Sequence, residues 1–513
     1  MWSCRNVQHS STPQNVPLPD GHCRLINQLP QEILSIIFKY SVDFDNDYSL
    51  LEGLVEQKQS SYNDEASIVA SQILPLELLV SHVCRLWRNI ALETPSLWAN
   101  ISVTNTACLP YERVVAYLER SKSFPLYICI AGGVTRLPSV EADNFEVLLA
   151  LLVPHLSRWA SIQVTVRRYE YMHAFLKAVS GPSIPPATRL EELILICYSK
   201  LGSMAIIKVD PDDNDLILFG ESAPLLRTLA LYAVHINWSQ AWVQSAPNLR
   251  TLHLSLHEMD LRPTSAILLG APKLQTLKIN NSGPLDVTVE PFIHLPNLLE
   301  LNYRDQDPLE FTWLLRRLCI PVLKTLTLHF HVDIPQIYSD LVTQLAGPAT
   351  QVTPSSIKQP CSLLRSLETL NIVRLPCSSG SAEILYRELV NLKVLKISML
   401  HMPPSFFDLL YTWRPNLSGG LDFMAPKGAQ SGSTVILLPS LKDLFLSGVT
   451  ILELPTLVMQ RRDAGVPLRS ISMKRQYETR LSEEVWLREN LEKFEITEDI
   501  DDEESEDSDS ESE

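Results

Sequence analysis

A six-residue pattern of leucines, L-x-x-L-x-L with Ile, Met, Tyr or Phe at some positions, recurs along most of the chain. Its copies begin at Leu190, Leu226, Leu249, Leu274, Leu298, Leu323, Leu367, Leu392, Leu441, Leu468 and Leu491. The steps from Leu226 to Leu323 are 23, 25, 24 and 25 residues long. Because side chains alternate along a strand, the fourth and sixth residues of each copy share one apolar face. Each copy therefore predicts a short strand, with its first leucine packed beneath that face.

A single strand with one apolar face is unstable, whereas stacked copies bury a continuous core. A period of about 20–29 residues is typical of leucine-rich repeats, and the pattern resembles that family. Helical returns are predicted between strands, at residues 308–318, 381–390 and 404–411. The asparagine that usually follows the family's strand is missing here, since those positions hold Val234, His257, Ser282 and Leu400. A plain buried α/β domain also contains such strands, but the period and the copy number favour an irregular α/β solenoid.

The array is predicted to span residues 99–496. Weaker strand patterns at residues 97–103, 125–130 and 159–166 place its start near residue 97. Two steps are close to double the period, 44 residues from Leu323 to Leu367 and 49 residues from Leu392 to Leu441. Each is expected to hide a degenerate repeat or to carry a long loop. Loops near 347–362 and 414–434 are rich in Pro, Gly, Ser and Thr, which favours disorder there.

A different, helical pattern precedes the array. Pro30 occupies a first helical position, and Ile33, Leu34, Ile37 and Phe38 then follow with the spacing of one helix face. A second helical stretch begins after Pro75 and ends at Thr94-Pro95. The residues expected on one side of this second helix are Val83, Cys84, Trp87 and Ile90.

These two blocks resemble an F-box, most closely the F-box-like families of mushroom-forming fungi. The match comprises L-P-x-E-I-L-x-x-I-F from Leu29, V-C-R-x-W-R-x-I-A from Val83, and the final Leu97-Trp98. The resemblance implies a helical module at residues 27–98 that binds a Skp-type adaptor and, through it, a cullin scaffold. The side chains that it assigns to the adaptor are Leu29, Pro30, Ile33, Leu34, Ile37, Phe38, Val83, Cys84, Trp87 and Ile90.

Residues 41–74 depart from the F-box pattern, because the family joins its blocks by a short linker. This polar, acidic stretch is predicted to be a solvent-exposed insertion, and residues 1–26 a disordered N-terminus. The alternative for the whole module is a helical cap of the solenoid, whose apolar residues form only an internal core.

Charge is distributed unevenly. The total is −16, and residues 498–513 contain eleven acids and no base, so the rest carries −16 + 11 = −5. Such a body has no broad basic field, which argues against nucleic-acid binding. The segment 497–513 is predicted to be a disordered acidic tail. Ser508 and Ser510, each with an acid three residues later, are candidate sites for an acid-directed kinase.

The sequence offers no secretory signal, no apolar stretch near the ~20 residues of a membrane span, and nine scattered cysteines without a C-x-x-C pair. We therefore expect a cytoplasmic or nuclear protein that is not secreted and does not contact membranes. Neither G-x-G nor G-x-S-x-G occurs. The pairs His253/His257 and His329/His331 are expected on or beside strands without other ligands. The sequence thus indicates no enzyme, no cofactor, no metal and no small-molecule substrate.

The resemblance predicts a substrate-recognition subunit of an SCF-type cullin ubiquitin ligase, with a protein client held by the repeats. The competing hypothesis is a non-catalytic leucine-rich-repeat scaffold without a role in ubiquitin transfer. Outward side chains between the leucines are the candidate client contacts: Thr228, Tyr232, His253, Lys278, Asn302, Arg304, His329, Asn371 and Lys396.

Overall fold

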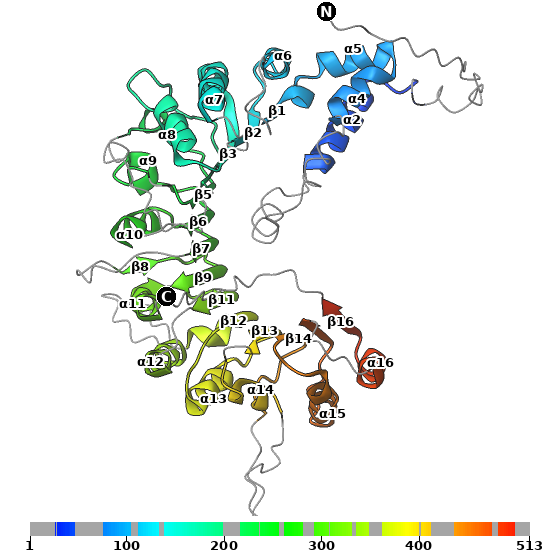
Figure 1. Cartoon of the computed structure of the whole chain (residues 1–513), viewed down its shortest axis with the longest axis vertical. Helices are drawn as coiled ribbons and strands as arrows, with labels where there is room; N and C mark the ends of the chain where they lie inside the picture. Colours follow the sequence, from blue (N-terminus) through cyan, green and yellow to red (C-terminus); the bar gives the residue numbers. More distant parts are fainter. Residues whose placement is uncertain are drawn as a thin grey trace, which may run out of the picture. The chain divides into compact units, whose positions relative to one another are not determined.

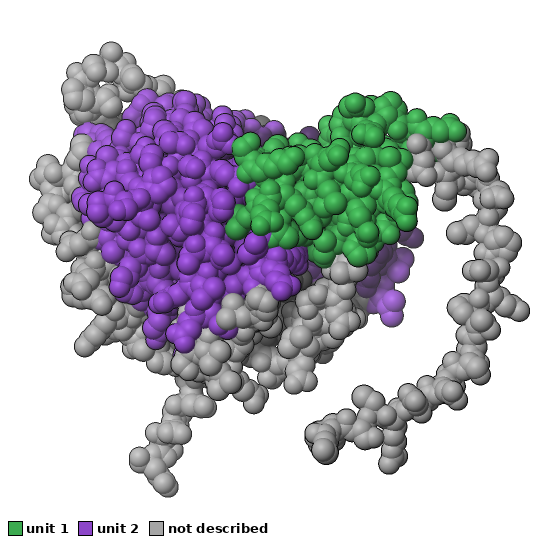
Figure 2. All heavy atoms as spheres, turned by 90° about the horizontal axis from the view of Figure 1, so that it is seen from above, with its two compact units in different colours: residues 1–99, 116–124 green, residues 100–115, 125–513 purple. Residues whose placement is uncertain are grey.

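The computed structural model describes residues 26, 28–46, 75–103, 111–132, 138–197, 216–234, 236–255, 261–280, 292–306, 308–330, 335–347, 362–399, 402–411, 436–474 and 481–497. Several predicted features lie wholly or mostly outside this part: the N-terminus, the insertion, both long loops, the acidic tail with Ser508 and Ser510, and His257, Ser282, His331 and Leu400. The chain divides into unit 1, residues 1–99 and 116–124, and unit 2, residues 100–115 and 125–513 (Figure 2).

Unit 2 is an α/β structure built on one long parallel sheet, in a solenoid-like arrangement (Figure 1). Fourteen strands of its described part pair in chain order, so that each of them except the edge strands β1 and β16 lies between two neighbours. These strands are β1 (Asn100–Val103), β2 (Leu126–Gly132), β3 (Trp159–Val166), β4 (Glu192–Cys197), β5 (Thr228–Tyr232), β6 (Thr251–Ser255), β7 (Thr276–Asn280), β9 (Glu300–Gln306), β11 (Thr325–Phe330), β12 (Thr369–Val373), β13 (Val394–Ser398), β14 (Asp443–Ser447), β15 (Ser470–Lys474) and β16 (Lys493–Thr497).

The register confirms the predicted strand faces. Leu229 of β5 pairs with Leu252 of β6, which pairs with Leu277 of β7, and all three are fully buried. The sixth positions continue the same face, for example Leu254 beside Ile279. Matching leucines thus stack from strand to strand into a continuous apolar core, which is what a solenoid requires of its repeated unit.

Helical returns connect the strands and lie along one face of the sheet (Figure 1). The predicted returns correspond to α11 (Pro308–Leu315), α13 (Ser379–Glu388) and α14 (Ser405–Asp408). The others described are α7 (Pro138–Leu152), η3 (Val153–Arg158), α8 (Tyr169–Ala178), η5 (Phe219–Glu221), α9 (Ala241–Gln244), α10 (Leu261–Leu269), α12 (Pro335–Ala346), η6 (Leu363–Ser366), η8 (Ile451–Glu453), α15 (Leu454–Asp463) and α16 (Leu481–Asn490). Short strands β8 (Ile293–His294) and β10 (Leu318–Cys319) form a separate parallel pair.

The two long steps add length to the returns and do not add a strand to the sheet. β11 pairs directly with β12, and β13 pairs directly with β14. The step after Leu323 contains α12, whose Tyr338, Leu341 and Val342 are fully buried. Each long step was expected to contain either a degenerate repeat or a long loop. The structure supports a long connection, because no further strand enters the sheet between these pairs.

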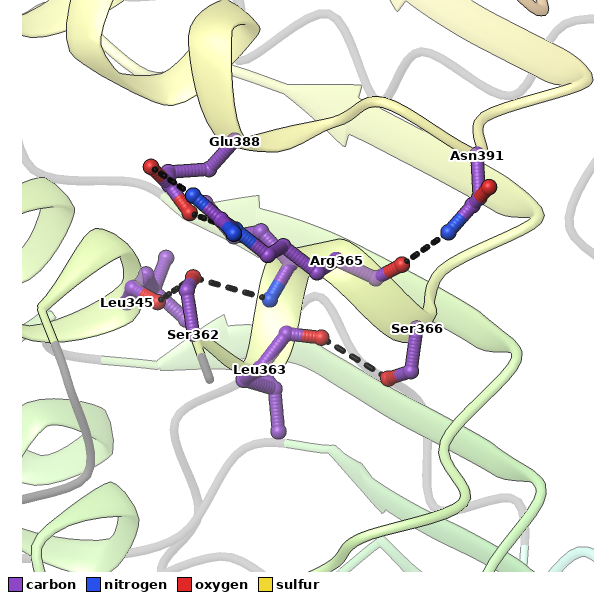
Figure 3. Close-up of polar contacts among 8 residues, drawn as sticks. Leu345, Ser362, Leu363, Arg365, Ser366, Glu388 and Asn391 are labelled. Carbon is purple, nitrogen blue, oxygen red and sulfur yellow. Dashed lines mark hydrogen bonds and ion pairs between the residues drawn. The ribbon is translucent and has the colours of Figure 1, made fainter. Parts of the chain in front are cut away.

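Asparagines also link successive repeat units, at a position that the sequence pattern did not single out. The Nδ2 of Asn248 donates to the carbonyl of Pro224 at 3.0 Å, and Asn297 donates to Pro272 at 2.9 Å. Asn391 donates to Arg365 at 2.7 Å (Figure 3). Each asparagine precedes the first leucine of its copy, so the ladder lies before the strand, whereas the family pattern led us to look after it. Each of these bonds satisfies a turn carbonyl of the preceding unit.

Unit 1 is a small helical assembly. Its described helices are α2 (Gln31–Asn46), α4 (Leu76–Val83), α5 (Arg85–Glu93), η2 (Pro95–Trp98) and the last residues of α6 (Glu112–Arg120). The predicted second helix is in fact two, because Cys84 adopts an extended backbone between α4 and α5. Its Sγ accepts the N–H of Trp87 at 3.5 Å and so caps the start of α5. The expectation that Val83 and Cys84 continue one helical face with Trp87 is therefore wrong.

Candidate protein-docking surfaces

Helix α2 has two apolar faces, and one of them is exposed. Ile33, Ile36, Ile37 and Tyr40 are spaced three or four residues apart and therefore lie on one side of the helix. Ile33 is 43% exposed and Tyr40 is 71% exposed. Leu29, also exposed, precedes this row by one further turn. We call these five side chains the α2 stripe. A solvent-exposed apolar surface of this kind is typical of a protein contact site.

The opposite face of α2 forms the core of unit 1. Leu34 and Phe38 are no more than 2% exposed, and the Phe38 ring lies 4.9 Å from the Trp87 ring, centroid to centroid. Ile90 of α5 is buried as well. The sequence assigned Leu34, Phe38 and Ile90 to the adaptor, but their side chains are enclosed within unit 1. We therefore assign these three to its internal packing, where they hold α2 against the later helices.

The remaining predicted adaptor residues lie at the surface to different extents. Pro30 and Cys84 are exposed, Val83 is 59% exposed at the end of α4, and Trp87 is half-buried against Phe38. Arg88, which lies on the same helix as Trp87, donates from Nε to the carbonyl of Ser81 at 2.9 Å. That bond satisfies a carbonyl in the last turn of α4 and fixes the angle between α4 and α5.

A buried polar network completes unit 1. The Nε1 of Trp98 donates to the carbonyl of Ala91 at 2.8 Å, and the Trp98 ring packs edge-on against Tyr117. The Tyr117 hydroxyl donates to the carboxylate of Glu77, and the Arg120 guanidinium lies 4.4 Å from the centre of the Trp98 ring. The final Leu-Trp of the sequence motif is thus structural, because Trp98 is fully buried and fastens the end of the module.

The predicted client residues lie in rows across the sheet of unit 2. His253, Lys278, Asn302, Asn371 and Lys396 occupy the middle outward position of β6, β7, β9, β12 and β13, and strand pairing aligns them in a single row. Two residues further along the strands, Tyr232, Arg304 and His329 occupy a second row, and Thr228 lies two residues before the middle row. All nine are partly or fully exposed. The structure therefore brings these candidates onto one strand surface.

Contacts within these rows leave some polar atoms unsatisfied. Lys278 lies 4.0 Å from the Glu300 carboxylate, and Arg304 donates to the Asn302 side chain at 3.2 Å. Within the described residues, the Nε2 of His253 and the Oδ1 of Asn280 are buried and have no hydrogen-bond partner. A buried polar atom without a partner costs about 1–3 kcal/mol, so this part of the surface is poised to gain from a new hydrogen bond.

His253 makes stability dependent on pH. Burial and the nearby Lys278 lower the pKa of its imidazole from 6.5 to about 4. The unfolded chain thus takes up the proton first, and the contribution of the neutral ring is complete above pH 6.5 and lost as the pH falls toward 4. We expect acidification from pH 7 to pH 5 to lower the free energy of unfolding by about 2 kcal/mol through this group. Urea unfolding should show that loss reduced in His253→Gln and retained in His294→Gln, which changes an exposed histidine.

The described part of the chain shows no grouping of side chains with metal-ligand chemistry. That part contains no cluster of three His, Cys, Asp or Glu residues able to hold a metal ion. Burial raises the pKa of the Cys129 thiol to about 11 and that of Cys377 to about 12, which disfavours the reactive thiolate. None of the described helices combines the length and apolar character that a membrane crossing needs.

Comparison with known proteins assigns no family to the chain. No protein-family model matches the sequence, and a search of curated proteins finds no significant match.

Proposed function

We propose that this protein is a substrate-recognition subunit of an SCF-type cullin ubiquitin ligase. Unit 1 would act as an F-box that binds a Skp-type adaptor, and unit 2 would act as an irregular leucine-rich-repeat array that binds a protein client. Catalysis then occurs elsewhere in the assembly. This chain raises the effective concentration of client lysines near the activated ubiquitin, which is a proximity effect.

The observation that supports the proposal most is the α2 stripe. A helical cap of the array would need its apolar residues for its own core, and Leu34 and Phe38 already serve that purpose. Leu29, Ile33 and Ile37 belong to the F-box-like motif and yet remain exposed on the folded unit. Motif residues that do not stabilise their own unit are best explained by a partner that covers them.

The experiment is capture of a purified Skp-type adaptor by the full chain. We expect Ile33→Ala/Ile37→Ala to weaken binding at least about 30-fold, since two central apolar anchors are truncated. Ile384→Ala is the matched control, because Ile384 is similarly exposed but lies on α13 in unit 2. Its adaptor affinity should equal that of the unmodified chain.

Circular dichroism and urea unfolding establish that the double variant is folded, as expected for exposed side chains. Undiminished adaptor capture by the folded double variant, or no capture by the unmodified chain, would contradict the proposal. The scaffold hypothesis would then account for unit 1 as a cap.

A further inference from the structure

A row of cationic side chains runs across the parallel sheet along the edge where the strands begin. In the long sheet, which excludes β8 and β10, the residue directly before each strand from β5 to β15 bonds through its backbone to the equivalent residue of the preceding strand, as Arg469 N–H does to the Lys442 carbonyl at 2.7 Å. Six of these nine positions are basic and one, Glu368, is acidic. We call the basic ones the pre-strand row: Arg227, Arg250, Lys324, Lys393, Lys442 and Arg469.

Fewer carboxylates than cations lie beside this row. Arg227, at the β5 end, is paired with Glu191 at 3.0 Å. The Glu368 carboxylate forms ion pairs with both Lys324 and Lys393, whose Nζ atoms lie 2.8 and 2.6 Å from its oxygens. This double contact lowers the pKa of the Glu368 carboxyl to about 2 through hydrogen bonds from both lysines. Asp443 is held by Arg469 at 2.8 Å. No ion pair to Lys442 is found among the described residues.

Positive charge is therefore in excess over the strands nearer β16. From β11 to β15, the pre-strand row and the outward Lys396 contribute five cations, against the carboxylates of Glu368 and Asp443 and that of Glu492, which lies next to Arg469 directly before β16. The rest of the chain, without residues 498–513, carries −5. A local excess of positive charge on a body that is negative overall marks a binding surface for an anionic segment.

The chain itself carries such a segment. Residues 498–513 hold eleven acids and no base, and they follow directly on Thr497, the last residue of β16. Sixteen extended residues reach about 53 Å. The path back along a five-residue strand is about 17 Å, and five strand spacings from β16 to β11 add about 24 Å. The segment is therefore long enough to cover the row as far as Lys324.

We propose that the acidic C-terminal segment, residues 498–513, binds in cis along the pre-strand row between Lys324 and Arg469. The contact is electrostatic and weakens with salt, because each cation is at the surface. Phosphate groups on Ser508 and Ser510 would add negative charge and strengthen it. This inference is independent of the ubiquitin-ligase proposal, since it concerns the isolated chain and requires no adaptor.

Zero-length carbodiimide cross-linking of the full chain tests the proposal. Mass spectrometry should find links from residues 498–513 to Lys393 and Lys442 at least about fivefold more often than to exposed Lys177 on α8, and about 0.5 M salt should remove this preference. The variant Lys396→Gln/Lys442→Gln should reduce the links that remain at Lys324 and Lys393 severalfold. Lys177→Gln is the control and should leave them unchanged.

Three results would overturn the proposal. The links could be spread evenly over exposed lysines, which indicates a solvated tail. They could join only two different chains in a mixture of isotopically labelled and unlabelled protein, which indicates that the partner is a second copy. Finally, they could persist unchanged in the folded double variant, as judged by circular dichroism.

Discussion

Arg461→Ala is expected to lower the free energy of unfolding of unit 2 by about 3–5 kcal/mol, through the cavity and the unsatisfied carbonyls that it leaves. Arg461 lies on α15 and is 0% exposed, although its side chain is cationic. Its guanidinium donates to the carbonyls of Leu410 at 3.1 Å, Leu437 at 3.4 Å and Leu438 at 2.8 Å. Truncation removes the donor of the Leu410 and Leu437 carbonyls, whereas the Leu438 carbonyl still accepts the N–H of Leu441 at 3.2 Å. It also leaves a cavity of the size of the largest side chains in the core.

Burial lowers the pKa of Arg461 to about 10, so the side chain remains charged at neutral pH. The measurement is urea unfolding of the full chain followed by circular dichroism. Arg462→Ala is the matched control, because the neighbouring Arg462 is exposed and, among the described residues, its side chain bonds to Asn490 alone; we expect it to cost less than about 1 kcal/mol. Equal losses in the two variants would show that the buried guanidinium contributes nothing beyond an ordinary surface arginine.

The strands of unit 2 were predictable because a period-2 apolar pattern is a local property of the sequence. In LRTLHL, Leu252 and Leu254 must share a face whichever neighbours they meet, and the fixed period then stacks equivalent residues. The early strands β1, β2 and β3 confirm even the weaker patterns at residues 97–103, 125–130 and 159–166. The outward rows follow from the same alternation, so the composition of the exposed strand surface could also be predicted from the sequence.

What the sequence concealed depends on contacts between distant residues. Helical spacing groups Ile33, Leu34, Ile37 and Phe38 as one broad apolar face, and only the packing of α4 and α5 decides which half is buried. The separation of α4 from α5 at Cys84 depends on a cap and on the Arg88–Ser81 bond. The sequence did not indicate that Arg461 is buried, because the carbonyls that accept its hydrogen bonds precede it by 23 to 51 residues.

The position of the asparagine ladder illustrates the same limit. A side chain before the strand can satisfy a carbonyl of the preceding unit only after the units have stacked, as Asn297 does with Pro272. The Pro-Asn-Leu sequence at Asn248 and at Asn297 was a usable signal, since it recurs at the same offset from the first leucine. The leucine-rich-repeat pattern places its asparagine at the other end of the strand, so the resemblance did not indicate Asn248 or Asn297.

Phe38→Ala and Ile37→Ala are expected to separate stability from binding in unit 1. Phe38 is 2% exposed and packs on Trp87, so its truncation should cost about 3–5 kcal/mol. Ile37 is the next residue on the same helix but points outward, and its truncation should change the free energy of unfolding by less than about 0.5 kcal/mol.

Hydrogen exchange of α2 amides in the full chain measures the first effect, because loss of core packing should raise their exchange rates in Phe38→Ala alone. Adaptor capture measures the second, and Ile37→Ala should weaken it while its α2 amides stay protected. Trp87→Ala would not distinguish the two roles, since Trp87 supports Phe38 in the core. If Ile37→Ala exposes the α2 amides as much as Phe38→Ala does, the α2 stripe is part of the internal packing, and an adaptor contact there loses its structural basis.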